Sequence, residues 1–362
     1  MTDAFPAPSG TLTLALSGGG VRAVAFHVGV LMHLAERGLL EQVNHISSVS
    51  GGSLATALVL ANAGRRWPSS SVYATSVFPA VRQCLCSRSL MWDGLAQLRR
   101  PLNWRYLLSR ANLIGKALEQ NWGLDFTMQE LPQSPTWSIN ATTAENGKRF
   151  RFKGITIGDY EGGYAEAADL SVSTAVAVSA AFPGGIGPLA LATADYRWKK
   201  RKWGEPESAA KQIDAQFKTL HLYDGGVYDN LGLEPLFDAG EGIPKSKDCI
   251  VIASDAGAPL EQGFSTIALN PWRLKRMADI MADQARSLRV RTFINYLKRT
   301  RAGAFIQIDS PLFDRTIETD AELACTFPTT LRRLSTAEFD ALSRHGRAVA
   351  RRVHETYGLG LV

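Results

Sequence analysis

The sequence has few cysteines and no long hydrophobic run. Only 4 of its 362 residues are cysteine, too few for a disulfide scaffold. The pair Cys84-Leu85-Cys86 has no second pair and no nearby histidine, which argues against a zinc site. No stretch of about 18 apolar residues is present, so we expect no membrane-spanning helix. Met1–Gly10 has no basic residue, unlike a signal peptide, and we expect a cytoplasmic protein that contacts membranes only from their surface.

Internal repeats, low-complexity tracts and an extreme composition are also absent. Apolar residues make up 45% of the chain and charged residues 20%, which is ordinary for a globular protein. Disorder, collagen and coiled coil are therefore excluded as overall descriptions. Lysine and arginine (40) exceed aspartate and glutamate (34), giving a net charge of +6. This excess favours anionic surfaces but does not choose between lipid and nucleic acid.

The first part of the chain alternates strand and helix patterns. Apolar strands are predicted over 11–16 and 43–49, and helices over 21–37 and 53–63. A glycine-rich turn joins each strand to the helix that follows it. This order predicts a parallel sheet with helices on its faces.

The rest of the chain is expected to complete one domain. Residues 67–135 mix tryptophan, arginine and leucine without a strand pattern, and we predict a helical insertion or cap there. After a tail at 1–10, a single α/β domain is expected to occupy 11–362, with a helical C-terminal region over 271–362.

Three consecutive glycines, Gly18, Gly19 and Gly20, join the first strand to the first helix. Such a turn lets backbone N–H groups converge at a helix N-terminus, where they bind a phosphate or a developing oxyanion. The alternative is a glycine turn with no ligand. The pattern also fits G-x-G-x-x-G/A, but Glu41 precedes the second strand, whereas a dinucleotide fold needs its acidic residue at that strand's end. A Walker A loop is excluded because no Gly-Lys-Ser/Thr follows.

A candidate nucleophile, Ser50, follows the second strand on a turn of small residues. The stretch from Ser48 to Ser53 reads Ser-Val-Ser-Gly-Gly-Ser, a variant of the G-x-S-x-G elbow with Ser48 in place of the first glycine. Small neighbours permit the strained backbone that holds a serine out of the sheet. The alternative is that Ser50 or Ser53 simply caps the helix.

A candidate base, Asp224, ends a short apolar strand and precedes Gly225-Gly226. Serine is a weak nucleophile and needs a base within about 2.6–3.2 Å. A carboxylate in a dry site gains the basicity for that role. The alternative for Asp224 is an ordinary Asp-Gly turn. A Ser–His–Asp triad would instead use His345 or His354, but both fall in a predicted helix rather than on a loop after a strand.

In this order, the motifs resemble the patatin-like phospholipase family over about residues 11–260. The resemblance implies a three-layer α/β/α fold and a Ser50–Asp224 dyad that needs no metal or other cofactor. Ser50 would attack a phospholipid ester and form an acyl-enzyme. The alternative is a catalytically idle or activator-dependent lipid- or partner-binding module on this fold. The matching stretches are Leu16-Ser-Gly-Gly-Gly-Val-Arg22, Ser48-Val-Ser-Gly-Gly52, Ser138-Ile-Asn-Ala-Thr142, Ser179-Ala-Ala-Phe-Pro-Gly184 and Asp224-Gly-Gly226.

The resemblance also assigns supporting residues. Gly18, Gly19 and Gly20 fall on the family's oxyanion-hole loop, and Arg22 falls on the arginine after it, where we expect it to support the substrate anion. A transient membrane contact is a separate hypothesis drawn from a basic run bracketed by tryptophans. The same run is compatible with nucleic acid, although short basic runs are unspecific and nothing else favours that partner. The proposed contact residues are Trp198, Lys199, Lys200, Arg201, Lys202 and Trp203.

Overall fold

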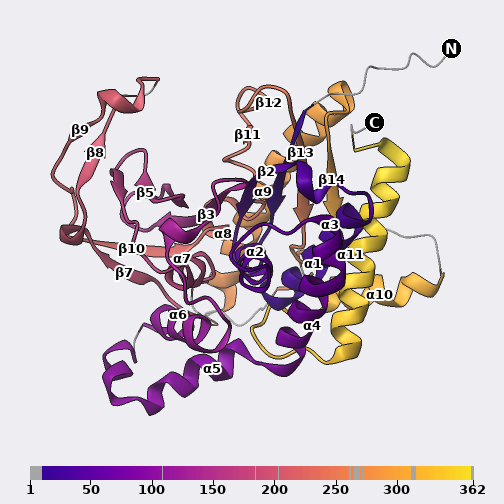
Figure 1. Ribbon diagram of the computed structural model, residues 1–362, viewed down its shortest axis with the longest axis horizontal. Helices are drawn as coiled ribbons and strands as arrows, with labels where there is room; N and C mark the ends of the chain where they lie inside the picture. Colours follow the sequence, from indigo (N-terminus) through magenta and orange to yellow (C-terminus); the bar gives the residue numbers. More distant parts are fainter. Residues whose placement is uncertain are drawn as a thin grey trace.

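A mixed β-sheet forms the centre of the computed structural model, and its middle strands run parallel in the order β14-β13-β1-β2-β3 (Figure 1). These strands are β1 (Thr11–Leu16), β2 (Val43–Ser48), β3 (Thr136–Thr143), β13 (Cys249–Asp255) and β14 (Gly303–Gln307). The structure describes residues 10–107, 109–183, 185–202, 204–260, 262–264, 270, 272–310 and 315–359.

Antiparallel strands extend the sheet beyond β3, toward the left of Figure 1. The strand β10 (Thr219–Asp224) pairs with β3 and with β7 (Leu189–Ala192), so it delivers its carboxyl end next to the parallel strands. The remaining strands are β4 (Arg149–Lys153), β5 (Thr156–Asp159), β6 (Gly163–Glu166), β8 (Trp198–Lys200) and β9 (Lys211–Gln212), with β11 (Phe237–Asp238) and β12 (Ile243–Pro244) as a separate hairpin.

Helices cover both faces of the sheet and enclose two hydrophobic cores, which confirms the three-layer α/β/α prediction. Strand β1 alternates its side chains: Leu14 and Leu16 enter the larger core, whereas Ala15 enters the smaller one on the other face. The larger core includes residues of α1 (Gly20–Glu36), α2 (Gly51–Asn62), α7 (Val172–Ser179) and α11 (Thr336–Tyr357), and the smaller core includes residues of α9 (Trp272–Thr300).

The described residues of 67–135 form α-helices, short 3₁₀ helices and one π-helix, Tyr73–Val77. The C-terminal prediction needs a correction, because β14 lies inside the region expected to be helical and pairs in parallel with β13. Within the described ranges, no helix is long and apolar enough to cross a bilayer. Residues 1–9 of the predicted tail lie outside the described residues. The helices of these regions are α3 (Ser70–Val72), α4 (Phe78–Ser87), α5 (Leu90–Ala96), α6 (Arg110–Asn121) and α10 (Arg315–Thr326).

Candidate active site

The register of the sheet brings Ser50 and Asp224 to the same level. Ser48 of β2 pairs with Ile139 of β3, and Ala141 of β3 pairs with Asp224 of β10. Because β2 and β3 are parallel, a residue two positions beyond Ser48 is level with Ala141. Strand β4 occupies the other edge of β3 along these residues, so β2 and β10 both pair with one edge of β3. Ser50 and Asp224 therefore approach each other at that edge, although 174 positions separate them in the chain.

Ser50 occupies a strained turn and keeps its hydroxyl free of helix capping. Its φ of 49° lies in the left-handed region, which costs a non-glycine residue on the order of 1–3 kcal/mol. Ser50 is the N-cap residue of α2, but its side chain makes no capping hydrogen bond. The hydroxyl of Ser53 interacts with Ser48 and Ser179 instead of capping the helix. The capping alternative for both serines is therefore wrong.

A chain of hydrogen bonds behind the turn fixes the backbone of Ser50. The Ser179 hydroxyl accepts from the Ser50 amide at 3.0 Å and donates to the Asn140 carbonyl at 2.7 Å. The carbonyl of Ser179 also accepts from the Gly225 amide, next to Asp224. Ser179 thus bonds to both halves of the candidate dyad. Sequence analysis gave it no role, although it begins a stretch that resembles the family.

Asp224 is buried beside the Ser50 hydroxyl. Burial raises the pKa of Asp224 to about 7, and hydrogen bonds from the Gly226 amide and the Ser50 side chain offset the increase only in part. The Gly226 amide donates to Oδ1 at 2.6 Å, and Thr142 donates to the Asp224 carbonyl at 2.9 Å. A carboxyl group with a pKa near neutrality is suited to exchange a proton with a serine.

Burial of Asp224 also predicts a pH-dependent stability. The pKa rises from 3.8 to about 7 on folding, so the folded state binds more protons between these values and loses stability as pH increases. Asp224→Asn removes this titration but keeps an acceptor for the Gly226 amide. We expect the variant to match wild type near pH 4 and to be more stable at pH 8, by up to about 4 kcal/mol. Chemical denaturation at both pH values tests this, and a variant less stable than wild type at pH 8 contradicts it.

The glycine loop differs from its expected role at one position. The Gly18 amide donates to the Asn230 carbonyl at 3.1 Å, so it is not available to an oxyanion. Among the described residues, the amides of Gly19, Gly20 and Gly51 have no hydrogen-bond acceptor. Gly20 has a φ of 63°, and a Cβ there would lie 2.5 Å from the Thr330 carbonyl oxygen, so only glycine fits.

Arg22 supports the loop rather than a substrate, which corrects the expectation from sequence. Its side chain is 1% exposed, and its guanidinium donates to the carbonyls of Ala256 and Phe327. Burial lowers the pKa of Arg22. Because these carbonyls occupy the donors, Arg22 fixes the backbone around the glycine loop and does not face a substrate anion.

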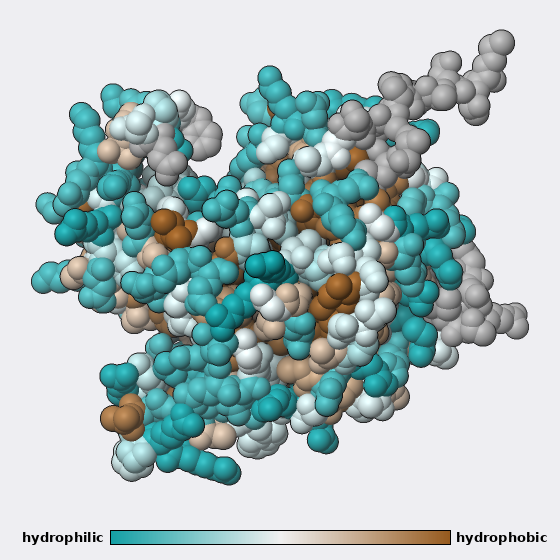
Figure 2. Space-filling view, in the orientation of Figure 1, coloured by the Kyte–Doolittle hydropathy of each residue, from teal (hydrophilic) through white to brown (hydrophobic). Residues whose placement is uncertain are grey.

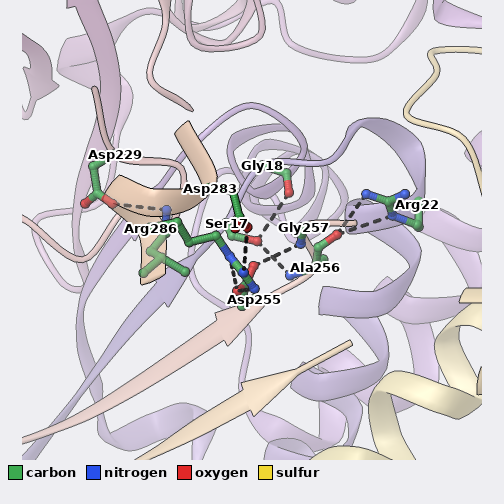
Figure 3. A network of polar contacts seen from close by, with 10 residues as sticks. Ser17, Gly18, Arg22, Asp229, Asp255, Ala256, Gly257, Asp283 and Arg286 are labelled. Atoms are coloured by element: carbon green, nitrogen blue, oxygen red, sulfur yellow. Dashed lines mark hydrogen bonds and ion pairs between the residues drawn. The ribbon is translucent and has the colours of Figure 1, made fainter. Parts of the chain in front are cut away.

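Polar contacts from β13 and α9 hold the same loop from the other side (Figure 3). The Ser17 hydroxyl accepts from the Ala256 amide at 2.7 Å and donates to the Gly18 carbonyl at 3.2 Å. The buried carboxylate of Asp255 accepts from the Gly257 amide at 2.9 Å and pairs with Arg286 of α9. Arg286, one of the basic residues of α9, thus forms an ion pair inside the fold.

The described histidines do not form a triad with Ser50. His345 is buried, and its Nε2 lies 2.6 Å from the Ile308 carbonyl oxygen. The Nδ1 of His354 lies 3.0 Å from Nε2 of His33. The Ser–His–Asp alternative is therefore wrong. The described part of the chain also contains no cluster of three or more histidine, cysteine, aspartate or glutamate side chains placed to hold a metal ion.

A small, narrow apolar pocket with a cavity volume of about 10 Å³ opens at Ser50. Its wall combines the core helix α2, the insertion helices α5 and α6, and α7. The insertion therefore contributes directly to the space in front of the serine. Besides Ser50 and Gly51, the lining residues are Leu54, Leu90, Ile114, Leu118, Val176, Ala180 and Leu331.

A serine turn beside an apolar pocket on an α/β/α fold is typical of lipid acyl hydrolases. The family model for the patatin-like phospholipase matches residues 14–237, and the chain belongs to this family. No curated protein sequence matches the chain.

Solved structures are similar in fold at low sequence identity. Human GIVD cytosolic phospholipase A2 aligns with a TM-score of 0.57 and 12% identity, covering 98% of this chain and 60% of that one. Its complex with methyl gamma-linolenyl fluorophosphonate aligns with a TM-score of 0.54 and 13% identity, covering 97% and 58%. The chain thus spans about 60% of the length of this phospholipase, and the similarity supports the fold alone.

Proposed function

We propose that the protein is a serine hydrolase that cleaves carboxylic ester bonds of glycerophospholipids, with Ser50 as nucleophile and Asp224 as base. One arrangement carries the proposal: Ser50 on its strained turn and the buried carboxyl of Asp224 meet at one edge of β3, beside an apolar pocket. Burial raises the pKa of this carboxyl to about 7. The lining of this pocket is almost entirely aliphatic, so the pocket would receive the acyl chain of a lipid once it widens, because its cavity has room for about one water molecule in this structure. No metal or other cofactor takes part in the proposed steps.

In the proposed mechanism, Asp224 takes the proton of Ser50 as its Oγ attacks the ester carbonyl. The carbonyl oxygen becomes an oxyanion, to which the free amides of Gly19, Gly20 and Gly51 donate. Each such donor is typically worth about 2.7–4 kcal/mol in the transition state. Asp224 then protonates the leaving alcohol, and the acyl group remains on Ser50. A water molecule, deprotonated by Asp224, releases the fatty acid and restores the serine.

The bond that is cleaved can be tested by product analysis. We expect vesicles of mixed glycerophospholipids to yield free fatty acid and a lysophospholipid with its head group intact, measured by mass spectrometry. Ser50→Ala protein purified in the same way is the control and should release at least about 10⁴-fold less of both. Release of the head group, or equal release by the control, would contradict the proposal.

An intact dyad argues against the alternative of a catalytically idle module. A decayed site would usually lose Ser50, Asp224 or the glycine loop, and all three are present. A module that only binds a partner would not need a buried carboxyl group with a pKa of about 7 beside a serine. The product assay, combined with labelling by a serine-reactive probe, also tests the requirement for an activator. A folded protein that reacts with the probe but releases no fatty acid would need one.

A further inference from the structure

The helical insertion exposes a group of large apolar side chains to solvent. They lie on α5 and on the segment that follows it, in the lower-left lobe of Figure 1. Leu102 is 85% exposed, and Trp92 and Trp104 are each 64% exposed. Figure 2 shows hydrophobic atoms at the outer end of this lobe, surrounded by hydrophilic ones. We call this surface the insertion face, and its apolar residues are Met91, Trp92, Leu95, Leu102, Trp104 and Leu107.

Cationic side chains without acidic partners surround these apolar residues. Residues 88–110 contain a single acidic residue, Asp93, whose carboxylate accepts a hydrogen bond from the Trp122 indole at 2.8 Å. Among the described residues, none of the exposed arginines of this segment forms an ion pair, although Arg100 donates to the Gln120 side chain and Arg110 to the Gly185 carbonyl. The insertion face therefore presents uncompensated positive charge next to apolar surface. The arginines are Arg88, Arg99, Arg100, Arg105 and Arg110.

The insertion face and the pocket share a helix. On α5, Leu90 lines the pocket beside Ser50, and Gly94 packs closely against Ile114, another lining residue. Trp92 and Leu95 of the same helix are exposed. An α-helix with its side chains is about 10 Å across, so the exposed surface and the acyl-binding space lie on different sides of a single helix.

The basic run expected to touch membrane is organised differently. Trp198 is 4% exposed, and its indole donates to the Thr193 carbonyl, so it cannot enter a bilayer interface. Lys199 lies 3.8 Å from Glu166, and Lys200 donates to the Glu161 carbonyl. The Arg201 guanidinium donates to the Glu205 carbonyl, and the backbone amide of Lys202 donates to the Glu205 carboxylate. The earlier assignment of this run is therefore wrong for Trp198, and Trp203 lies outside the described residues.

We infer that the insertion face docks the protein on the surface of an anionic phospholipid bilayer, and that this contact presents lipid to the pocket. The inference rests on the proposed function for its substrate. Tryptophan favours the level of the lipid head groups, leucine and methionine enter the acyl boundary, and arginine pairs with phosphate. Apolar surface beside cations that have no acidic partner matches such an interface, where negatively charged head groups lie above an apolar interior.

Vesicle binding tests the inference in the full chain with Ser50→Ala as the parent, so that binding is measured without hydrolysis. Sucrose-loaded vesicles of phosphatidylcholine with about one third phosphatidylglycerol are sedimented with the protein, and vesicles of phosphatidylcholine alone serve for comparison. Neutralising two arginines, Arg88→Gln with Arg99→Gln, is expected to weaken partitioning onto anionic vesicles about 25-fold, roughly five-fold for each charge. The matched control, Lys199→Gln with Lys200→Gln, removes the same charge from β8 and should partition like the parent.

A second variant tests the apolar part. Trp92→Ser with Leu102→Ser changes two highly exposed side chains, so it should fold normally by circular dichroism and bind at least ten-fold more weakly. Equal binding by the parent and both insertion-face variants would overturn the inference, as would a loss in the β8 control alone. If the parent were a dimer in light scattering and the Trp92→Ser, Leu102→Ser variant a monomer, this face would instead bind a second copy of the chain. None of these outcomes depends on hydrolysis, so the proposed function stands or fails separately.

Discussion

Replacing Ser50 by alanine is expected to lower kcat for phospholipid ester hydrolysis by at least about 10⁴-fold, the largest effect of any single change in the chain. Alanine lacks the oxygen that must bond to the acyl group, so the reaction loses its covalent path. The amides of the glycine loop would still polarise an ester, which leaves a small residual rate. Titration of released fatty acid from mixed phospholipid vesicles measures the loss.

Ser53→Ala is the matched control, because it removes a hydroxyl from the same turn without touching the dyad. The hydroxyl of Ser53 lies 2.9 Å from those of Ser48 and Ser179, so its loss loosens the support of the turn. We expect a decrease of about ten-fold or less, since the Ser179 hydroxyl still accepts from the Ser50 amide. If the Ser53 variant were as inactive as the Ser50 variant, the assignment of Ser50 as the nucleophile would be wrong.

Asp224→Asn is expected to decrease kcat by about 10⁴-fold, because an amide of the same shape cannot accept the serine proton. The wild-type enzyme should gain activity as pH rises through about 7, where Asp224 changes from the protonated form to the carboxylate. The residual activity of the variant should lack this rise. Initial rates between pH 5 and 9 for both proteins test the assignment.

The outcome that would contradict this role is a wild-type profile already on its plateau at pH 5. Such a profile would mean that the base titrates near the ordinary range of an aspartate, or that another group accepts the proton. The stability measurement described above reports on the same pKa without any substrate. Agreement between the kinetic midpoint and the pH at which the two proteins diverge in stability would tie both effects to Asp224.

Much of the fold was predictable because its signals are local. Apolar strands followed by glycine turns and helices gave the order of β1, α1, β2 and α2 to within two residues at each end. The strand β14 was missed because its five residues lie between two long helical segments and resemble a linker. The stability of this short edge strand depends on its pairing with β13, and the sequence of the strand alone does not predict that pairing.

The supporting residues of the site were less predictable, because their roles depend on contacts between distant segments. Arg22 has the position expected for an anion-binding residue after the glycine loop, but the carbonyls of Ala256 and Phe327 come more than 230 residues later. Ser179 acts through its contacts with Ser50 and Gly225. The burial of Trp198 was likewise not predictable, since a charge and tryptophan pattern does not show which side chains are exposed.

The central claim, that Ser50 is the acylated nucleophile, is tested most directly by mapping a covalent adduct. The wild-type protein is treated with a fluorophosphonate carrying a long acyl-like chain, digested, and analysed by tandem mass spectrometry. The account predicts one phosphonate on the peptide that contains Ser50, at the serine oxygen, and none in the Ser50→Ala protein. An adduct on Ser53 or on any other residue, or no adduct on a folded protein that hydrolyses phospholipid, would contradict it.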